Sequence, residues 1–199
     1  RLLAYGKEKG VGIILWSSWR NAVKQTEADF RHYADMGVKG FKVDFFDRDD
    51  QVAVRSAWQI AETAAKHHLL LDFHGYRPTG IQVAWPNIVN FEGVKGLENS
   101  KWEPRAGDAP LHDQPRYDVQ IPYLRQLVGP LDYTPGAMRN ATRAEFFGNN
   151  DHPMSQGTRA HQVAMYVVFD APLQMLADSP TKYQKEQKTT DFISQIPTT

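Results

Sequence analysis

The chain has 199 residues, with 23 basic and 23 acidic side chains, and it contains no cysteine. The balanced charge gives no indication of a nucleic-acid partner or an anionic membrane surface, and the lack of cysteine excludes disulfides and thiolate metal sites. Aromatic residues form 12% of the sequence, a share that suits a neutral polar ligand such as a sugar and equally suits a large core.

The first half of the sequence alternates apolar runs with amphipathic stretches, after a start at Arg1, Leu2 and Leu3 that looks like the middle of a helix. We therefore expect the chain to be an excerpt of a longer protein. No apolar run approaches the roughly 18 residues of a membrane span, so none is expected. Strands are predicted over residues 11–17, 41–44, 69–74 and 87–93, and helices over residues 26–36 and 49–67.

The second half is richer in proline and glycine, so its elements are predicted between longer loops. Loops are expected over residues 99–116 and 139–153. Helices are predicted over residues 118–128, with Pro122 in the first turn, from a cap at Ser155, and after Pro180. The helix after Ser155 is expected to bury Ala160, Val163, Ala164, Val167 and Val168. Short strands are predicted over residues 131–133 and 172–176.

Strands that alternate with helices and loops six times predict an α/β fold with a parallel sheet and right-handed crossovers. A complete (β/α)8 barrel of the TIM type takes about 250 residues, more than this chain has. We therefore predict that residues 1–199 form one partial barrel that holds roughly the last six βα units.

The strand over residues 41–44 ends in a carboxylate, Asp44, with Lys42 two residues earlier on the same face. Ligands in parallel α/β folds bind at the carboxyl ends of strands, so Asp44 occupies a position typical of catalysis. The alternative is that both side chains are solvated edge charges. Central parallel strands are usually apolar throughout, which favours a functional Lys42 and Asp44.

Other predicted strands also end in polar residues, and a barrel would gather those ends in one mouth. Several carboxylates in one place indicate either acid/base chemistry on a glycosidic bond or a divalent metal. A structural cap is at least as good an interpretation for Asp72 and Asp178. Glu92 and Glu98 flank a loop with two glycines, which lets both carboxylates address one hard cation or one proton. The strand-end residues are Asp72 with His74, Glu92, Asp132 with Tyr133, and Asp178.

Several short motifs occur together in this sequence, and their combination is specific although each is short. They are Gly40-Phe41-Lys42-Val43-Asp44-Phe45, His74 with Arg77-Pro78-Thr79-Gly80, Asn90-Phe91-Glu92 through Glu98-Asn99, Gly129-Pro130-Leu131-Asp132-Tyr133-Thr134-Pro135-Gly136, and Ser179-Pro180-Thr181-Lys182-Tyr183. From about residue 10 to the end, the chain resembles the catalytic barrel of glycoside hydrolase family 97. The resemblance implies flanking N-terminal and C-terminal β-domains that lie outside this chain.

The resemblance also implies a mechanism. Inverting α-glucosidases of the family carry Gly where this chain has Asp44, and a Glu base directly after the His that matches His74. This chain has Asp44 and Gly75, so it resembles the retaining branch, which includes α-galactosidases and arabinopyranosidases. Asp44 is then the expected nucleophile and Glu98 the expected general acid/base. Retention requires the two carboxyl groups to face each other at about 5 Å.

Further residue roles follow from the resemblance alone. Calcium is the implied metal, held by Glu92 and Glu98, and a galactoside or oligosaccharide is the implied substrate. The family resemblance also implies a periplasmic or secreted location. Two alternatives stay open, an α-glucosidase of the same family and a carbohydrate-binding barrel without turnover that uses Trp16, Trp19, Trp85 and Trp102. The expected substrate-binding residues are Lys42, Trp16, His74 and Asp132.

Overall fold

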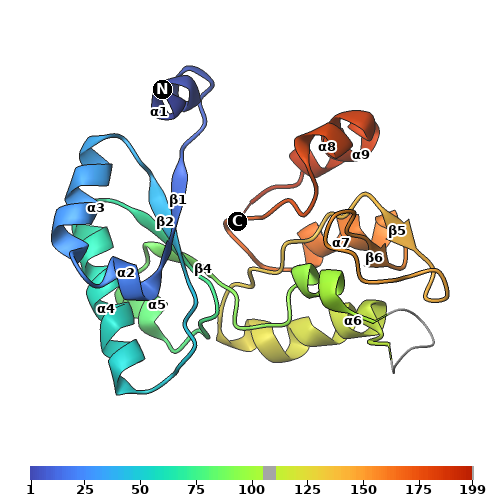
Figure 1. Ribbon diagram of the computed structural model, residues 1–199, viewed down its shortest axis with the longest axis horizontal. Helices are drawn as coiled ribbons and strands as arrows, with labels where there is room; N and C mark the ends of the chain where they lie inside the picture. The colour runs from blue at the N-terminus through green and yellow to red at the C-terminus, as the bar shows by residue number, and fades with distance from the viewer. Residues whose placement is uncertain (105–110, 199) are drawn as a thin grey trace. The chain divides into compact units, whose positions relative to one another are not determined.

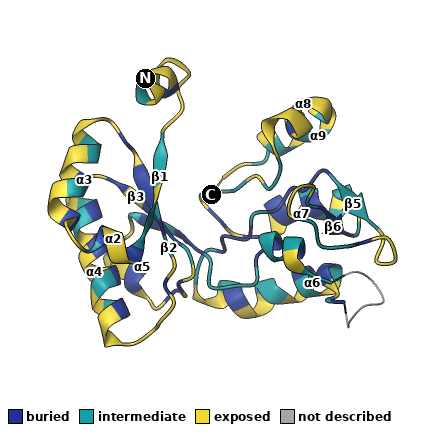
Figure 2. Cartoon of the chain, in the orientation of Figure 1, coloured by how far each residue is buried: buried dark blue, intermediate teal, exposed yellow. Residues whose placement is uncertain are grey.

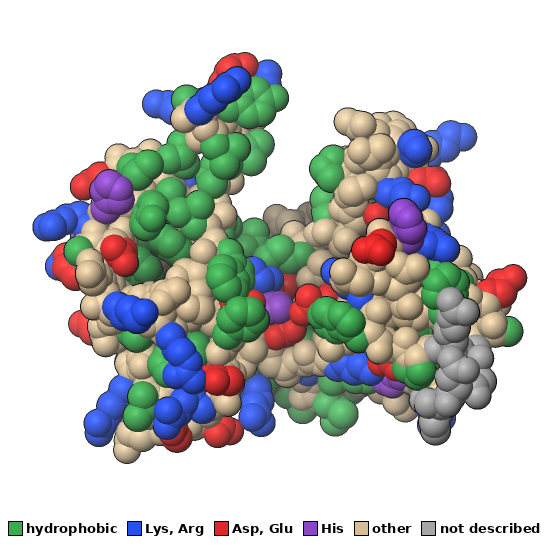
Figure 3. Space-filling view, in the orientation of Figure 1, with side chains coloured by type: hydrophobic (Ala, Val, Ile, Leu, Met, Phe, Trp, Pro, Cys, Tyr) green, Lys and Arg blue, Asp and Glu red, His purple; other side chains and the backbone are tan. Residues whose placement is uncertain are grey.

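The computed structural model describes residues 1–104 and 111–198. The chain divides into two compact units, Arg1–Gly93 and Val94–Thr199. Within the described residues, none of the helices has the length and apolar character needed to cross a membrane. On the face drawn in Figure 3, basic and acidic side chains are interspersed over each unit, in line with the balanced composition.

The first unit is built on a four-stranded parallel sheet whose strands follow one another in chain order (Figure 1). All four strands predicted in this half are confirmed. The first begins at Ile14 rather than at residue 11, because the N–H of Val11 bonds to the carbonyl of Gly6 and closes the preceding helix. The strands are β1 (Ile14–Ser18), β2 (Gly40–Asp44), β3 (Leu70–Phe73) and β4 (Ile88–Phe91).

Helices cover one face of this sheet, and Figure 2 shows that α3 and α4 turn their buried sides toward the strands. The core between them is almost wholly apolar, with Phe30, Phe41 and Phe73 among its largest side chains. The opposite face of the sheet carries the polar residues of the strands. The helices of this unit are α1 (Leu2–Glu8), α2 (Trp19–Ala22), α3 (Thr26–Asp35), α4 (Gln51–Lys66) and α5 (Ile81–Ala84).

Helix α4 is defined by local signals at both ends. The side chain of Asp50 accepts hydrogen bonds from the N–H groups of Val52 and Ala53, as expected of an N-cap. At the other end His68 adopts a left-handed conformation with φ of 56°. The N–H of Leu69 then bonds to the carbonyl of Ala64, which closes the helix. His68 thus serves through its backbone, a role that the sequence pattern did not reveal.

The second unit is mostly helical and irregular, with two two-residue strands paired in parallel. The predicted strands over residues 131–133 and 172–176 are wrong within the described chain. Leu131 and Tyr133 make only isolated backbone hydrogen bonds, to Asp170 and Leu97. Pro130 precedes the first segment and Pro172 opens the second, and a proline has no N–H to give to a ladder. The elements are η1 (Leu97–Trp102), α6 (Gln114–Arg125), η2 (Gln126–Val128), β5 (Asn140–Ala141), β6 (Ser155–Gln156), α7 (Arg159–Val168), α8 (Pro180–Lys185) and α9 (Gln187–Ser194).

Two helix starts in this unit differ from the prediction. Helix α6 begins at Gln114 because Asp113 caps it and Pro115 occupies its first turn, so Pro122 lies inside the helix. Helix α7 is capped by Thr158, whose Oγ1 accepts from the N–H of His161 at 3.1 Å. Ser155, the predicted cap, lies in β6. The predicted loop over residues 99–116 includes the end of η1 and the start of α6, and residues 105–110 lie outside the described part.

The predicted inner face of α7 is also wrong. Val167 and Val168 are 68% and 56% exposed, whereas Gln162, Met165 and Tyr166 are buried. Gln162 turns inward because its Oε1 accepts hydrogen bonds from two backbone N–H groups, those of Gly136 and Ala137. A polar anchor, rather than the apolar stripe, sets the rotation of this helix.

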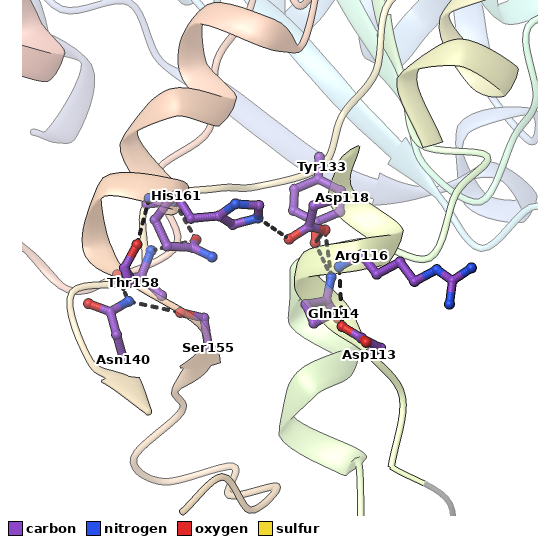
Figure 4. A network of polar contacts seen from close by, with 12 residues as sticks. Asp113, Gln114, Arg116, Asp118, Tyr133, Asn140, Ser155, Thr158 and His161 are labelled. Atoms are coloured by element: carbon purple, nitrogen blue, oxygen red, sulfur yellow. Dashed lines mark hydrogen bonds and ion pairs between the residues drawn. The ribbon is translucent and has the colours of Figure 1, made fainter. Parts of the chain in front are cut away.

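A polar network centred on Asp118 joins α6 and α7 in the second unit (Figure 4). The Asp118 carboxylate is fully buried and lies 2.9 Å from Nε2 of His161. It also accepts hydrogen bonds from Gln114 and from the hydroxyl of Tyr133. Burial, followed by the nearby Asp118 charge, raises the pKa of Tyr133 well above its ordinary value, so the phenol keeps its proton and donates.

Candidate functional site

Two rows of side chains cross the face of the first unit's sheet that the helices leave uncovered. The strand register places Trp16 opposite Lys42, Lys42 opposite Asp72, and Asp72 opposite Asn90. Alternate residues of a strand point to opposite faces, so these four side chains share one face and form a row. Asp72 and Asn90 are buried although Asp72 carries a carboxylate and Asn90 an amide.

The second row lies at the carboxyl ends of three neighbouring strands. Asp44 is the last residue of β2. The N–H of His74 bonds to the carbonyl of Val43 at 2.8 Å, and the N–H of Glu92 bonds to the carbonyl of Phe73 at 2.9 Å. These hydrogen bonds extend the ladder by one residue and bring Asp44, His74 and Glu92 side by side.

The carboxylate of Asp44 is held by a donor at each oxygen. Its Oδ2 accepts a hydrogen bond from Nε1 of Trp16 at 3.0 Å, and its Oδ1 accepts one from the backbone N–H of Phe45. The side chain keeps a small opening, with 16% of its surface exposed. A fixed, partly open carboxylate at a strand end is suited to attack a bound substrate.

His74 lies between two carboxylates. Its Nδ1 is 3.2 Å from Oε2 of Glu92 and 3.7 Å from Oδ1 of Asp44. Glu92 is oriented in turn by the N–H of Gly75, which donates to the same Oε2 at 2.7 Å. The arrangement suits proton sharing, and the hard oxygens of Glu92 also suit a cation such as calcium.

Lys42 forms an ion pair with Asp72, with Nζ 3.2 Å from Oδ2. The Asp72 side chain is fully buried and that of Lys42 is 23% exposed. Burying a charged pair costs desolvation energy, so such a pair in a sheet interior indicates a specific use.

Gly75 packs closely against the end of β2. It has a φ of 69°, and a Cβ built on it would lie 3.3 Å from the backbone N of Phe46 and 3.9 Å from Oδ1 of Asp44. A side chain at this position would therefore be strained by its backbone and crowded by Phe46. It would also begin beside the Asp44 carboxylate.

Two predicted site residues belong to the second unit. Glu98 lies on η1 directly after Leu97, whose N–H bonds to the carbonyl of Tyr133 at 3.1 Å and anchors the segment. Asp132 is buried and accepts a hydrogen bond from Oγ1 of Thr134 at 3.5 Å. The other five predicted site residues, Trp16, Lys42, Asp44, His74 and Glu92, lie in the first unit.

The four tryptophans named for a non-catalytic sugar cleft do not share one environment. Trp19 is 3% exposed, stacks on Phe46 with ring centroids 5.6 Å apart, and belongs to the apolar core. Trp85 packs edge-on against Trp58 of α4. Trp16 belongs to the first row of side chains, and its Nε1 donates a hydrogen bond to Asp44 of the second row.

Two features of this site are not predicted from the sequence. Phe45 has a φ of 63°, an unusual value for a residue that is not glycine, and follows Asp44 directly. Arg20 forms two hydrogen bonds with Asp47 and lies over the ring of Trp19. No periodicity signals a left-handed phenylalanine, although an apolar residue directly after a strand-end acid could have raised the question.

The comparisons with known proteins agree with the geometry. A family model described as Glycoside hydrolase 97 matches residues 1–94. The chain is 50% identical over 198 residues to a retaining alpha-galactosidase of Bacteroides thetaiotaomicron, a match that covers 99% of the chain and 29% of that protein. It is 31% identical over 199 residues to a probable retaining alpha-galactosidase of Streptomyces bingchenggensis, and that match covers 98% of the chain and 28% of that protein. The chain thus spans less than a third of the length of these relatives.

Solved structures match almost the whole chain. A glycoside hydrolase family 97 enzyme from Pseudoalteromonas sp. strain K8, in complex with panose, has a TM-score of 0.81 and 26% identity, with 99% of this chain and 32% of that chain covered. A beta-arabinopyranosidase structure has a TM-score of 0.81 and 25% identity, and the match covers 99% of this chain and 33% of that chain. The α/β fold of the chain matches these glycoside hydrolase structures over almost its whole length. The chain is thus similar to glycoside hydrolase family 97, by the family model over residues 1–94 and by a solved structure over 99% of its length.

Proposed function

We propose that the protein is a retaining exo-glycosidase that cleaves terminal α-galactoside-type bonds. The observation that carries the proposal is Asp44, a partly open carboxylate at the end of β2 whose two oxygens are held by Trp16 and Phe45. The names of the two curated relatives support the choice of galactosides. The family supports a carbohydrate as the substrate.

In the first step, Asp44 attacks the anomeric carbon of the terminal sugar while the glycosidic C–O bond breaks. Glu98 gives its proton to the departing oxygen, so the aglycone leaves as a neutral alcohol. The sugar is then joined to Asp44 as a glycosyl ester. The hydrogen bonds from Trp16 and Phe45 keep the carboxylate oriented, which lowers the entropic cost of the attack.

In the second step, the Glu98 carboxylate takes a proton from water, and the water oxygen displaces Asp44 from the anomeric carbon. Two displacements restore the original configuration of the sugar. Glu98 regains its proton and Asp44 its negative charge, so the enzyme is ready for another substrate.

The proposed retention is supported by Gly75. An inverting relative would carry a Glu base at this position, yet here a side chain would begin 3.9 Å from Oδ1 of Asp44. A side chain at residue 75 would therefore begin in contact with the Asp44 carboxylate, on a backbone whose φ of 69° favours glycine. This chain has the two residues expected of the retaining branch, an Asp at position 44 and a Gly at position 75.

We also propose calcium as a bound ion, held by Glu92 and Glu98. The carboxylate oxygens of Glu92 fit a hard cation, and its Oε2 is already oriented by the N–H of Gly75. When bound, the ion would supply positive charge that orients sugar hydroxyls. We further propose that the full-length protein contains the remaining βα units of a closed barrel and flanking β-domains.

The experiment is an assay of the full-length protein on nitrophenyl α-galactoside, α-glucoside and β-L-arabinopyranoside. The proposal predicts the highest kcat/KM for α-galactoside, with the arabinopyranoside next because it has the same ring configuration. A higher kcat/KM for α-glucoside would contradict the assignment of α-galactosides as substrates. Binding of galactosides with no turnover of any of the three would favour a non-catalytic protein.

A further inference from the structure

Asp72 is a charged residue in the interior of the first unit's sheet. Its side chain is fully buried, and the register places it between Lys42 of β2 and Asn90 of β4. Its neighbours along β3, Leu71 and Phe73, are buried as well. Replacing a buried ion pair by apolar residues of similar volume often leaves a protein equally or more stable. Folding alone therefore gives little reason for an Asp and a Lys at these two positions.

Only one member of this ion pair has surface on the open face of the sheet. Asp72 is fully buried, whereas 23% of the Lys42 side chain is exposed. A ligand on this face can therefore meet the pair only through Lys42. Nζ of Lys42 lies 3.2 Å from Oδ2 of Asp72, so the carboxylate holds the head of a long and flexible side chain in one place. Holding the ammonium in advance lowers the entropic cost of binding a ligand to it.

Lys42 and Asp44 lie two residues apart on the same face of β2. Two residues of a strand span about 6.6 Å, a distance that one pyranose ring with its hydroxyls can bridge. A nucleophile attacks the anomeric carbon on the side of the ring opposite to the leaving group. In an α-galactoside, the axial hydroxyl at C4 lies on that attacked side. A galactosyl ring bound over Asp44 therefore turns its C4 hydroxyl toward the sheet face that carries Lys42.

We propose that Asp72 is a positioning residue for sugar recognition, which holds the Lys42 ammonium where it donates a hydrogen bond to the axial C4 hydroxyl of a bound galactosyl group. This inference rests on the proposed function, and it gives a role to a residue for which the sequence also allowed a structural cap. Glucose carries its C4 hydroxyl in the equatorial position, so an α-glucoside would forgo this hydrogen bond.

The test measures kcat and KM of the full-length protein on nitrophenyl α-galactoside and on its 4-deoxy analogue. In the wild type, loss of the C4 hydroxyl should lower kcat/KM about 10- to 100-fold, the range for a hydrogen bond to a charged donor. Asp72→Asn keeps the size of the side chain and removes its charge. It should raise KM for the galactoside about 10-fold with kcat changed less than about twofold, and it should change kcat/KM for the 4-deoxy analogue less than about threefold.

A double variant separates this role from a structural one. Asp72→Asn leaves the Lys42 charge in the sheet without its partner and should lower Tm. Lys42→Met/Asp72→Asn removes both charges and should regain Tm, while its kcat/KM for the galactoside should stay at the low value of Lys42→Met. Glu27→Gln is a matched control, because it breaks an exposed ion pair in which Oε1 of Glu27 lies 2.9 Å from Nζ of Lys66. It should leave KM unchanged.

Two results would overturn the positioning role while the wild type remains an active galactosidase. One is a KM that recovers together with Tm in the double variant. The other is an equal loss of kcat/KM for the galactoside and its 4-deoxy analogue in Asp72→Asn. If Asp72→Asn does not fold, a 4-deoxy penalty that persists in Lys42→Met and in the double variant would overturn the inference. An inactive wild type would instead overturn the proposed function.

Discussion

The two units of the chain are held together in different ways. In the first, a parallel sheet satisfies the backbone, and the core is apolar except for Thr26, Asp72 and Asn90. The second unit has little sheet and buries many polar side chains that bind loop backbone or one another. They are Ser100, Gln114, Asp118, Arg125, Asp132, Ser155, Gln156 and Gln162.

The difference follows from where the backbone hydrogen bonds go. Buried N–H and C=O groups need partners, and loops cannot supply a ladder. In the second unit, side chains provide many of these partners. The hydroxyl of Tyr166 donates toward the carbonyls of Pro135 and Met175, and Gln162 accepts from backbone N–H groups of the loop that follows Pro135. Regular structure thus satisfies much of the backbone of the first unit, whereas buried polar side chains take over part of that role in the second unit.

The largest expected effect comes from removing the proposed nucleophile of the first unit. Asp44→Gly should lower kcat on a natural galactoside by about 10⁴-fold or more, because the variant lacks the carboxylate that forms the glycosyl ester. Added azide should restore turnover of a nitrophenyl α-galactoside by filling the vacated space. The product should be the β-galactosyl azide, identified by NMR, since one displacement inverts the centre.

Two results would count against this role of Asp44. One is an α-azide product. The other is a folded Asp44→Gly variant, with wild-type Tm, that keeps natural turnover.

The next effect concerns the proposed acid/base of the second unit. Glu98→Gln should slow hydrolysis of natural galactosides by about 10² to 10⁴-fold. It should slow hydrolysis of a nitrophenyl galactoside much less, because that leaving group needs no proton. Its defect should persist at any calcium concentration. Glu92→Gln is the matched comparison, expected to raise the calcium requirement and to recover at saturation. If the two variants respond alike to calcium and to leaving group, the division of roles is wrong.

A stability measurement sharpens the contrast between the units. Asp118→Ala should destabilise the protein by about 3 kcal/mol, because it leaves Gln114 and Tyr133 buried without their shared acceptor. That loss should rival the roughly 3 to 5 kcal/mol of Phe73→Ala in the apolar core. Asp118→Asn keeps one acceptor oxygen and should cost less. Thermal unfolding that shows Asp118→Ala near the wild-type Tm would contradict a structural role for this network.

The smallest expected effect is a gain. His68→Gly should stabilise the first unit by about 1 kcal/mol, since glycine adopts the left-handed cap of α4 without strain. His67→Gly is the control, because His67 has a φ of −100° and contacts Glu27 at 3.1 Å. It should bring no gain in the same denaturation experiment. A loss of stability in His68→Gly would show that the imidazole itself matters.

The sequence predicted the first unit well because its signals are local. The alternation from Phe41 to Asp44 and the cap at Asp50 act within a few residues of the elements they define. The second unit depends on contacts distant in sequence, so patterns failed there. Gln162 rotates α7 through a loop 25 residues away, and Ser155 pairs in a short strand although it looks like a cap.

The same division applies to the candidate site. Sequence identified Asp44, His74 and Glu92 as strand-end residues, and the register brings them side by side. It did not predict the donor from Trp16 or the conformation of Phe45, because both depend on how β1 lies beside β2. The predicted roles of Glu98 and Asp132, and the calcium ion, stay predictions.

The most direct test of the central claim is the stereochemistry of the first product. The full-length protein is mixed with nitrophenyl α-galactoside, and the anomeric proton of the released sugar is followed by NMR before mutarotation. Two displacements at one carbon, through Asp44 and then water, predict that α-galactose forms first and β-galactose appears only later. If β-galactose forms first, Asp44 is not a covalent nucleophile and the retaining mechanism is contradicted.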